Sequence, residues 1–169
     1  MLFKKTLLAV AALAFAGAAS AVTPVVGSFQ VTLKIESKCT IATLADVGLG
    51  TRQAGVGSGV ANTAKGSTDI SVTCNDGLPY SIGLVAASNP TNITGGGWLL
   101  GASTTLPEKI PYVMRTGIDG GGLNWGSGAN VIGETGSGVA KIKTVFVSLA
   151  SLSFKPDSYS DTVNVTVTY

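Results

Sequence analysis

A strict two-residue alternation runs through the segment from Val25 to Glu36. From residue 29 onward, apolar side chains occupy every second position, namely Phe29, Val31, Leu33 and Ile35. The residues between them are polar, and Val25 and Gly27 continue the apolar series toward the N-terminus. Successive side chains of a strand point to opposite faces, whereas the apolar face of a helix repeats every three or four residues. The segment is therefore predicted to be a strand with one apolar face and one polar face.

A second alternation occupies the C-terminal residues and predicts a strand from Tyr159 to Tyr169. Its apolar face holds Val163, Val165, Val167 and Tyr169, and its polar face holds Thr162, Asn164, Thr166 and Thr168. The chain shows no further segment that would pair with this strand. We therefore expect an open edge, and a partly uncovered core, unless another strand lies alongside.

Shorter strands are predicted between these two segments. They cover residues 39–41, 69–74, 80–84, 110–114 and 141–152. The turn sequence Asn75-Asp76-Gly77 predicts a hairpin between residues 69–74 and 80–84. Glycine-rich residues 44–68 are expected to hold only short or interrupted strands. Residues 86–108 are expected to be mainly loop, with Trp98-Leu99-Leu100 apolar enough to pack. Residues 117–138 are expected to be a long connection, or two strands joined by flexible turns.

The fold class that follows is all-β. Residues after position 21 show no amphipathic helix pattern, and short alternating strands separated by turn residues are typical of an antiparallel, immunoglobulin-like sandwich.

The first residues have the features of a secretory signal peptide. Lys4 and Lys5 precede an apolar run from Leu7 to Ala16, which is too short to span a bilayer. The sequence Ala19-Ser20-Ala21 fits a cleavage site. We therefore expect residues 1–21 to be removed, which leaves 148 of the 169 residues as one exported domain.

The charge balance excludes some classes of partner. Eleven Lys and Arg residues become nine once Lys4 and Lys5 are removed, against nine Asp and Glu. A neutral chain with scattered charges has no basic surface that would attract nucleic acid or an anionic membrane.

Two cysteines, Cys39 and Cys74, follow the predicted signal peptide. In an oxidising compartment such a pair most simply forms one disulfide. The alternative is a pair of reduced cysteines in the core.

The residues that most enzymes and metal sites require are scarce. The chain has no histidine, which removes the commonest general base and metal ligand. Asp157 and Asp161 are the one carboxylate pair to consider, and hydrogen bonding at turns and strand ends is the favoured role for both. Packing is likewise the favoured role of Trp98 and Trp125, rather than stacking on a sugar. We expect no enzyme activity, no cofactor and no metal site.

Three segments resemble the spore coat protein U family, which includes subunits of archaic chaperone-usher pili. The segments are Ile35–Ile41, Asp69–Cys74 and Ser158–Tyr169, of which the last contains the fairly specific pattern Tyr-x-Asp-Thr-Val. The similarity follows the order of the whole chain, including the signal peptide and the paired cysteines.

This resemblance implies an incomplete immunoglobulin-like sandwich that lacks its last strand. Residues 22–36 would be an N-terminal donor strand and residues 37–169 the pilin domain, joined by the short linker Ser37-Lys38. The implied donor side chains are Val25, Phe29, Val31, Leu33 and Ile35. The implied acceptor groove is bordered by Tyr159, Val163, Val165, Val167 and Tyr169.

The resemblance also implies partners and a location. A periplasmic chaperone would lend a strand, and at an outer-membrane usher the donor segment of another subunit would replace it, giving a homopolymer or a mixed fimbrium at the cell surface. The alternative is a self-contained spore-coat or extracellular matrix protein whose first strand pairs within its own chain. A carbohydrate-binding tip adhesin is a third class, but it normally needs a second domain.

Overall fold

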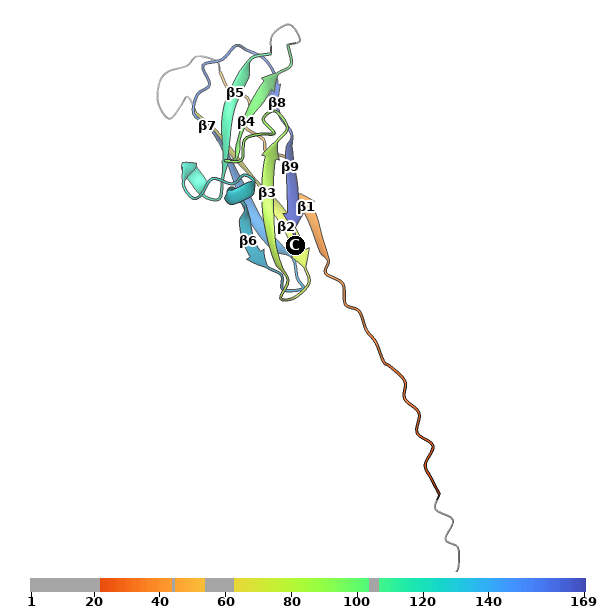
Figure 1. Ribbon diagram of the computed structural model, residues 1–169. Helices are drawn as coiled ribbons and strands as arrows, with labels where there is room; N and C mark the ends of the chain where they lie inside the picture. Colours follow the sequence, from red (N-terminus) through yellow and green to blue (C-terminus); the bar gives the residue numbers. More distant parts are fainter. Residues whose placement is uncertain (1–21, 44, 54–62, 104–106) are drawn as a thin grey trace, which may run out of the picture. The chain divides into compact units, whose positions relative to one another are not determined.

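The computed structural model describes residues 22–43, 45–53, 63–103 and 107–169 (Figure 1). The predicted signal peptide, residues 1–21, lies outside the described residues. The chain divides into an N-terminal unit that ends at Lys34 and a body from Ile35 to Tyr169. The two are described separately below.

The body is a sandwich of two antiparallel sheets, as predicted from the sequence. In the order of the sheet, the larger one contains β1 (Cys39–Thr43), β2 (Ala64–Cys74), β7 (Lys141–Leu149), β5 (Lys109–Arg115), β4 (Gly96–Gly101) and β8 (Tyr159–Ser160). The smaller one contains β6 (Ile132–Thr135), β3 (Pro79–Ala86) and β9 (Val163–Thr168). Two short 3-10 helices, η2 (Ile118–Gly120) and η3 (Gly128–Asn130), lie in the connection between β5 and β6.

The core is built from alternate residues of the strands. Ile70 and Val72 of β2 and Ile82 and Leu84 of β3 are at most 1% exposed, as is Trp125 from the glycine-rich connection. The Trp125 indole Nε1–H donates to the backbone oxygen of Ile82 at 2.9 Å. The polar atom of this large side chain is therefore satisfied inside the core, which is the packing role expected of Trp125.

The predicted hairpin between residues 69–74 and 80–84 is wrong. β2 pairs with β1 and β7, whereas β3 pairs with β6 and β9 in the other sheet. The turn does form, because the Leu78 N–H donates to the Asn75 oxygen and Gly77 takes a φ of 73°. Both strands bury an apolar face in the same core, so the turn carries the chain across from one sheet to the other.

The predicted C-terminal strand from Tyr159 to Tyr169 is divided between the sheets. Tyr159 and Ser160 pair with β4, whereas residues from Val163 onward pair with β3. The Asp161 carboxylate accepts the backbone N–H of Thr162 at 2.8 Å, so this N–H is satisfied outside a ladder. In the sequence, the crossover is marked only by Asp161, a polar residue between Tyr159 and Val163 in the otherwise apolar series.

β2 is longer than predicted, β4 lies in a segment expected to be loop, and β6 lies within residues 117–138, for which the expectation is a long connection or two strands joined by turns. β2 begins at Ala64, five residues before the predicted start, and β4 lies within the expected loop 86–108. Glycine explains why the sequence pattern does not reveal β4, because a Cβ on Gly97 would lie 2.4 Å from Cζ of Tyr112. The position needs a residue without a side chain, and this breaks the apolar alternation.

Cys39 and Cys74 form the disulfide expected from the sequence, and they are directly paired residues of β1 and β2. The bond closes a loop with a sequence separation of 35 residues and fixes β1, which pairs with β2 alone among the strands that the structure describes.

We expect reduction of this bond to lower the free energy of unfolding by roughly 2–4 kcal/mol, because the unfolded chain gains the freedom of the open loop. Urea denaturation of the oxidised and reduced protein measures the difference. Equal midpoints and slopes would contradict a stabilising role.

Candidate functional site

Strand β9 has an open edge. It is the last strand of the smaller sheet, and among the described residues its ladder is formed with β3 alone. The inward-facing Val163, Val165 and Val167 are only partly buried, although they pair with fully buried residues of β3. The apolar face of β9 therefore lacks part of the cover that its partner strand has.

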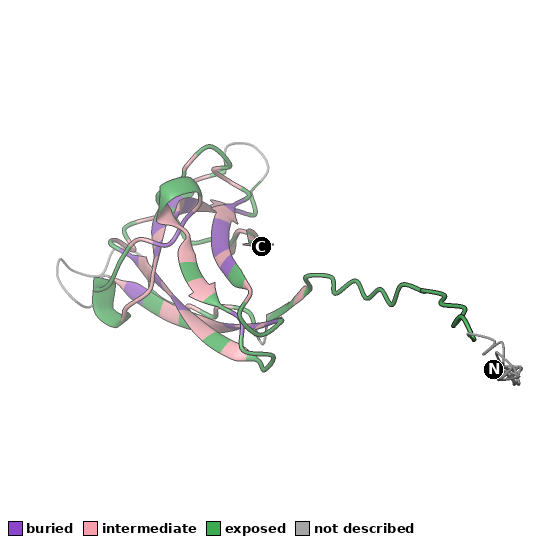
Figure 2. Ribbon diagram, turned by 60° about the horizontal axis from the view of Figure 1, so that its bottom comes forward, coloured by how far each residue is buried: buried purple, intermediate pink, exposed green. Residues whose placement is uncertain are grey.

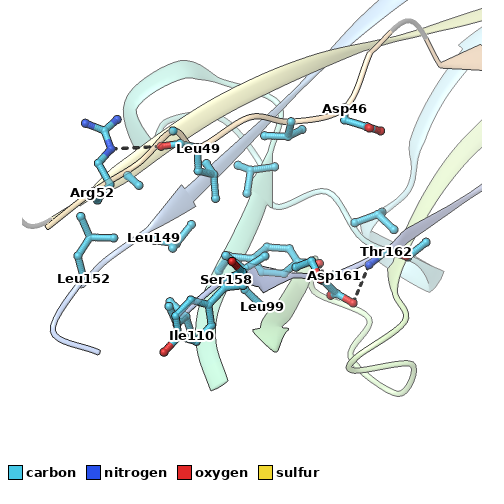
Figure 3. Close-up of a pocket in the computed structure, with 18 of the residues that line it drawn as sticks. Asp46, Leu49, Arg52, Leu99, Ile110, Leu149, Leu152, Ser158, Asp161 and Thr162 are labelled. Carbon is cyan, nitrogen blue, oxygen red and sulfur yellow. Dashed lines mark hydrogen bonds between the residues drawn. The ribbon is translucent and has the colours of Figure 1, made fainter. Parts of the chain in front are cut away.

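A cavity of about 940 Å³ lies beside this edge, between the two sheets (Figure 3). Its floor consists of inward-facing residues of β2, β5 and β7, such as Ile70, Met114 and Val147, and β9 contributes Val163 and Val165. All of its lining residues lie between Ala45 and Val165, within the body. A cavity of this size with an apolar floor can hold several side chains of a bound segment.

Residues 45–53 form one wall of the cavity. Figure 3 shows Asp46, Leu49 and Arg52 on one side and Ser158, Asp161 and Thr162 on the other. Val47 and Leu49 pack against Gly66 of β2, where an added Cβ would lie 2.8 Å from Val47 Cγ1. The Thr68 hydroxyl also donates to the backbone oxygen of Ala45. The wall is thus attached to the larger sheet.

A polar cluster around Asp161 lies in the wall of the cavity, to which Asp161 and Tyr112 both contribute. Its Oδ2 accepts the Tyr112 hydroxyl at 2.7 Å and the Ser88 hydroxyl at 2.6 Å. Its Oδ1 accepts the backbone N–H groups of Thr162 at 2.8 Å and Ser88 at 3.2 Å. Burial, together with the hydrogen bond to this carboxylate, raises the pKa of Tyr112 far above its usual value.

Tyr159 also lines the cavity. Its hydroxyl donates toward the Glu108 carboxylate at 2.9 Å and the Lys155 backbone oxygen at 2.8 Å. Burial and the hydrogen bond to Glu108 raise the pKa of Tyr159 to about 12. Asp157 accepts the N–H groups of Ser103 and Ser158. Asp157 and Asp161 therefore both have the hydrogen-bonding role that the sequence favoured.

The two raised tyrosine pKa values predict a loss of stability in alkali. An unfolded tyrosine ionises near pH 10, whereas Tyr112 and Tyr159 stay protonated in the folded chain. Their contribution to the free energy of unfolding is complete below about pH 10 and is lost as the pH rises toward the pKa values of the folded chain. We expect the melting temperature to fall less steeply between about pH 9 and pH 11 in Tyr112→Phe than in the wild type. Parallel plots of melting temperature against pH for the two proteins would contradict a contribution of Tyr112 to the loss of stability in alkali.

The residues of the N-terminal segment are exposed (Figure 2). Residues 22–38 are assigned to no strand, in contrast to the strand predicted for Val25–Glu36. The five predicted donor side chains are 82–100% exposed, namely Val25, Phe29, Val31, Leu33 and Ile35. Exposed apolar groups at this density are typical of an interaction segment.

The predicted groove residues have different positions. Tyr159, Val163 and Val165 line the cavity. Val167 is partly buried, and Tyr169 is 56% exposed. Sequence reasoning missed the wall at residues 45–53, for which the alternation of Val47 and Leu49 is the only signal. It also missed the link from Asp161 to Ser88 and Tyr112, which are distant in sequence.

Other kinds of site are not found in the part of the chain that the structure describes. No group of three or more His, Cys, Asp or Glu side chains there has an arrangement suited to a metal ion. None of the described helices is long and apolar enough to cross a membrane.

Comparison with family models gives a match to the Spore Coat Protein U domain over residues 25–166. The chain belongs to this family. The Spore Coat Protein U domain match includes the exposed N-terminal segment, the disulfide and most of β9.

The fold of this Spore Coat Protein U domain is similar to that of a solved structure. The structure is the CsuC–CsuE chaperone–tip adhesion subunit pre-assembly complex from archaic chaperone-usher Csu pili of Acinetobacter baumannii. The match has a TM-score of 0.51 and 17% sequence identity, and it covers 80% of this chain and 40% of that chain. The chain thus spans less than half of the solved chain. A comparison with curated proteins found no match.

Proposed function

We propose that this chain is a structural subunit of a secreted pilus, which polymerises when the N-terminal segment of one copy enters the cavity of another. The observation that carries the proposal is the presence in one chain of an open β9 edge beside an apolar cavity and of an exposed segment with an alternating apolar face. The added strand would form main-chain hydrogen bonds with β9 and place alternate side chains in the cavity.

The energy available from this insertion is large. Full burial of one Val, Leu, Ile or Phe side chain contributes about 1.5–3 kcal/mol. The five exposed donor side chains together would contribute roughly 7–15 kcal/mol before the cost of ordering the segment. This upper range is consistent with a stable polymer contact.

The geometry of the contact leads to a filament. The donor segment and the cavity are different surfaces, so each copy can donate to one neighbour and accept from another. Such a head-to-tail contact does not have to close into a ring. The role is structural and requires no catalytic residue.

The proposal includes partners that would handle the subunit before assembly. An open edge and an exposed apolar cavity are an aggregation hazard. A periplasmic chaperone that occupies the cavity would remove this hazard, and the solved structure with a similar fold is a chaperone–subunit complex. An outer-membrane usher would then exchange the chaperone for the donor segment. The subunit would pass through the periplasm and function in a fimbrium at the cell surface.

Gel filtration and negative-stain electron microscopy of the purified mature protein test the proposal. We expect high-mass species and thin fibres whose formation accelerates with protein concentration. No peptide of residues 22–36 is added, because it would compete for the cavity. A monodisperse monomer that never assembles under these conditions would instead favour a self-contained coat protein.

A further inference from the structure

The Asp161 carboxylate joins elements of both sheets. Through the Tyr112 hydroxyl it contacts β5, and through Ser88 it contacts the residue pair that follows β3. The Ser88 hydroxyl oxygen in turn accepts the Trp98 N–H of β4 at 2.8 Å. One side chain thus links strands of the larger sheet to the end of the central strand of the smaller sheet.

Asp161 also lies where the chain changes sheet. Ser160 is the last residue paired with β4, and Val163 is the first paired with β3, so Asp161 and Thr162 alone form the crossover. Thr162 is held on both sides, because its N–H donates to Asp161 and its oxygen accepts the Ala87 N–H at 2.8 Å. The start of β9 is therefore fixed by contacts outside its ladder.

We propose that Asp161 is a positioning residue that sets the register at which β9 offers its open edge to an incoming strand. The inference rests on the proposed strand addition and deepens it. A slip of one residue would turn Val163 and Val165 away from the cavity and bring Asn164 into it. Because, among the described strands, β9 is paired with β3 alone, its register depends on β3 and on the crossover that Asp161 holds.

The variant Asp161→Asn keeps the size of the side chain but replaces one acceptor oxygen with an N–H donor. It cannot accept all four hydrogen bonds of the carboxylate. The acceptor for the experiment is the full mature chain with Leu33→Arg, whose own segment is disabled as a donor. The probe is a labelled peptide of residues 22–36, and fluorescence anisotropy gives its dissociation rate.

Cysteine cross-linking reports the register. Thr166→Cys places a thiol on the outward face of β9, and directly opposed residues on one face of a strand pair lie close together. Four peptides each carry one cysteine on their polar face: Ser28→Cys, Gln30→Cys, Thr32→Cys and Lys34→Cys. The native Cys39–Cys74 pair is already bonded and does not compete.

We expect one peptide position to give most of the cross-linked product with the parent acceptor. Asp161→Asn should lower the share of that position, because a slip of two residues moves the cross-link to a neighbouring peptide position and a slip of one residue turns the Thr166→Cys thiol toward the cavity and removes it. The same variant should speed peptide dissociation by about tenfold or more, as loss of a charged hydrogen bond allows. Asp69→Asn is the matched control, because Asp69 accepts the Thr144 hydroxyl at 2.6 Å in the β2–β7 pair. Asp69→Asn should give most of its cross-linked product at the same single peptide position as the parent acceptor.

Two outcomes overturn the inference, and they differ in whether the proposed strand addition also fails. If Asp161→Asn keeps the single position and the parent dissociation rate, the positioning role is wrong and strand addition stands. If the parent acceptor binds no peptide, the proposed function fails as well. Should Asp161→Asn not fold, Tyr112→Phe removes one of the four donors and is expected to broaden the pattern in the same direction.

Discussion

The variant Leu33→Arg is expected to form no fibres. Leu33 is 84% exposed and lies in the middle of the apolar series of the N-terminal segment, so the body does not need it to fold. In the proposed polymer its side chain enters an apolar cavity, where an unpaired charge costs several kcal/mol. A cost of about 3 kcal/mol alone lowers the affinity of each contact more than 100-fold. Electron microscopy and gel filtration measure the loss.

The control for this variant is Thr32→Arg, which places the same charge one residue away on the polar face. We expect Thr32→Arg to assemble as the wild type does, because its side chain points away from the cavity in a strand. Normal fibres from Leu33→Arg would contradict the proposal, and so would equal loss in both variants.

The second large effect is expected at the other surface of the contact. Val165→Arg should abolish fibre formation, because Val165 lines the cavity and, in the proposed polymer, would face the incoming strand. Val165 is only partly buried, so the arginine stem can lie along the open cavity with its charge toward solvent. The body should therefore remain folded, which circular dichroism and thermal melting test. Thr166→Arg, on the outward face of β9, is the matched control.

A mixture of the two defective chains distinguishes donor from acceptor. Leu33→Arg keeps an intact cavity, and Val165→Arg keeps an intact N-terminal segment. Mixed, they should form a dimer that grows no further, because the dimer has neither a working free donor nor a working free cavity. Fibres in the mixture, or the absence of any complex, would contradict the head-to-tail arrangement.

Within the body, the sequence predicted strands with clear alternation, since a pleated strand with one buried face leaves a two-residue period in the chain. The strict alternation of Val25–Glu36, in contrast, belongs to residues that form no strand in the structure. β5 and β9 are found where that period occurs, with Ile110, Tyr112 and Met114 all buried. The period does not record which sheet a strand joins. This is why the turn at residues 75–77 was predicted as a hairpin and the crossover at Asp161 was not seen.

The cavity was predictable only in outline. Alternation indicated an uncovered face on the C-terminal strand, and the family resemblance named the residues along it. The opposite wall depends on Val47 and Leu49 packing against Gly66, which is a contact between segments that local patterns do not connect. Asp161 was assigned to hydrogen bonding, but its partners Ser88 and Tyr112 are 73 and 49 residues away.

A structure of the assembled protein tests the central claim most directly. The account predicts residues Val25 to Ile35 of one copy in the cavity of another, hydrogen-bonded along β9, with Phe29, Val31 and Leu33 facing inward. A cavity filled by the segment of its own chain, or left empty while copies meet through another surface, would contradict it.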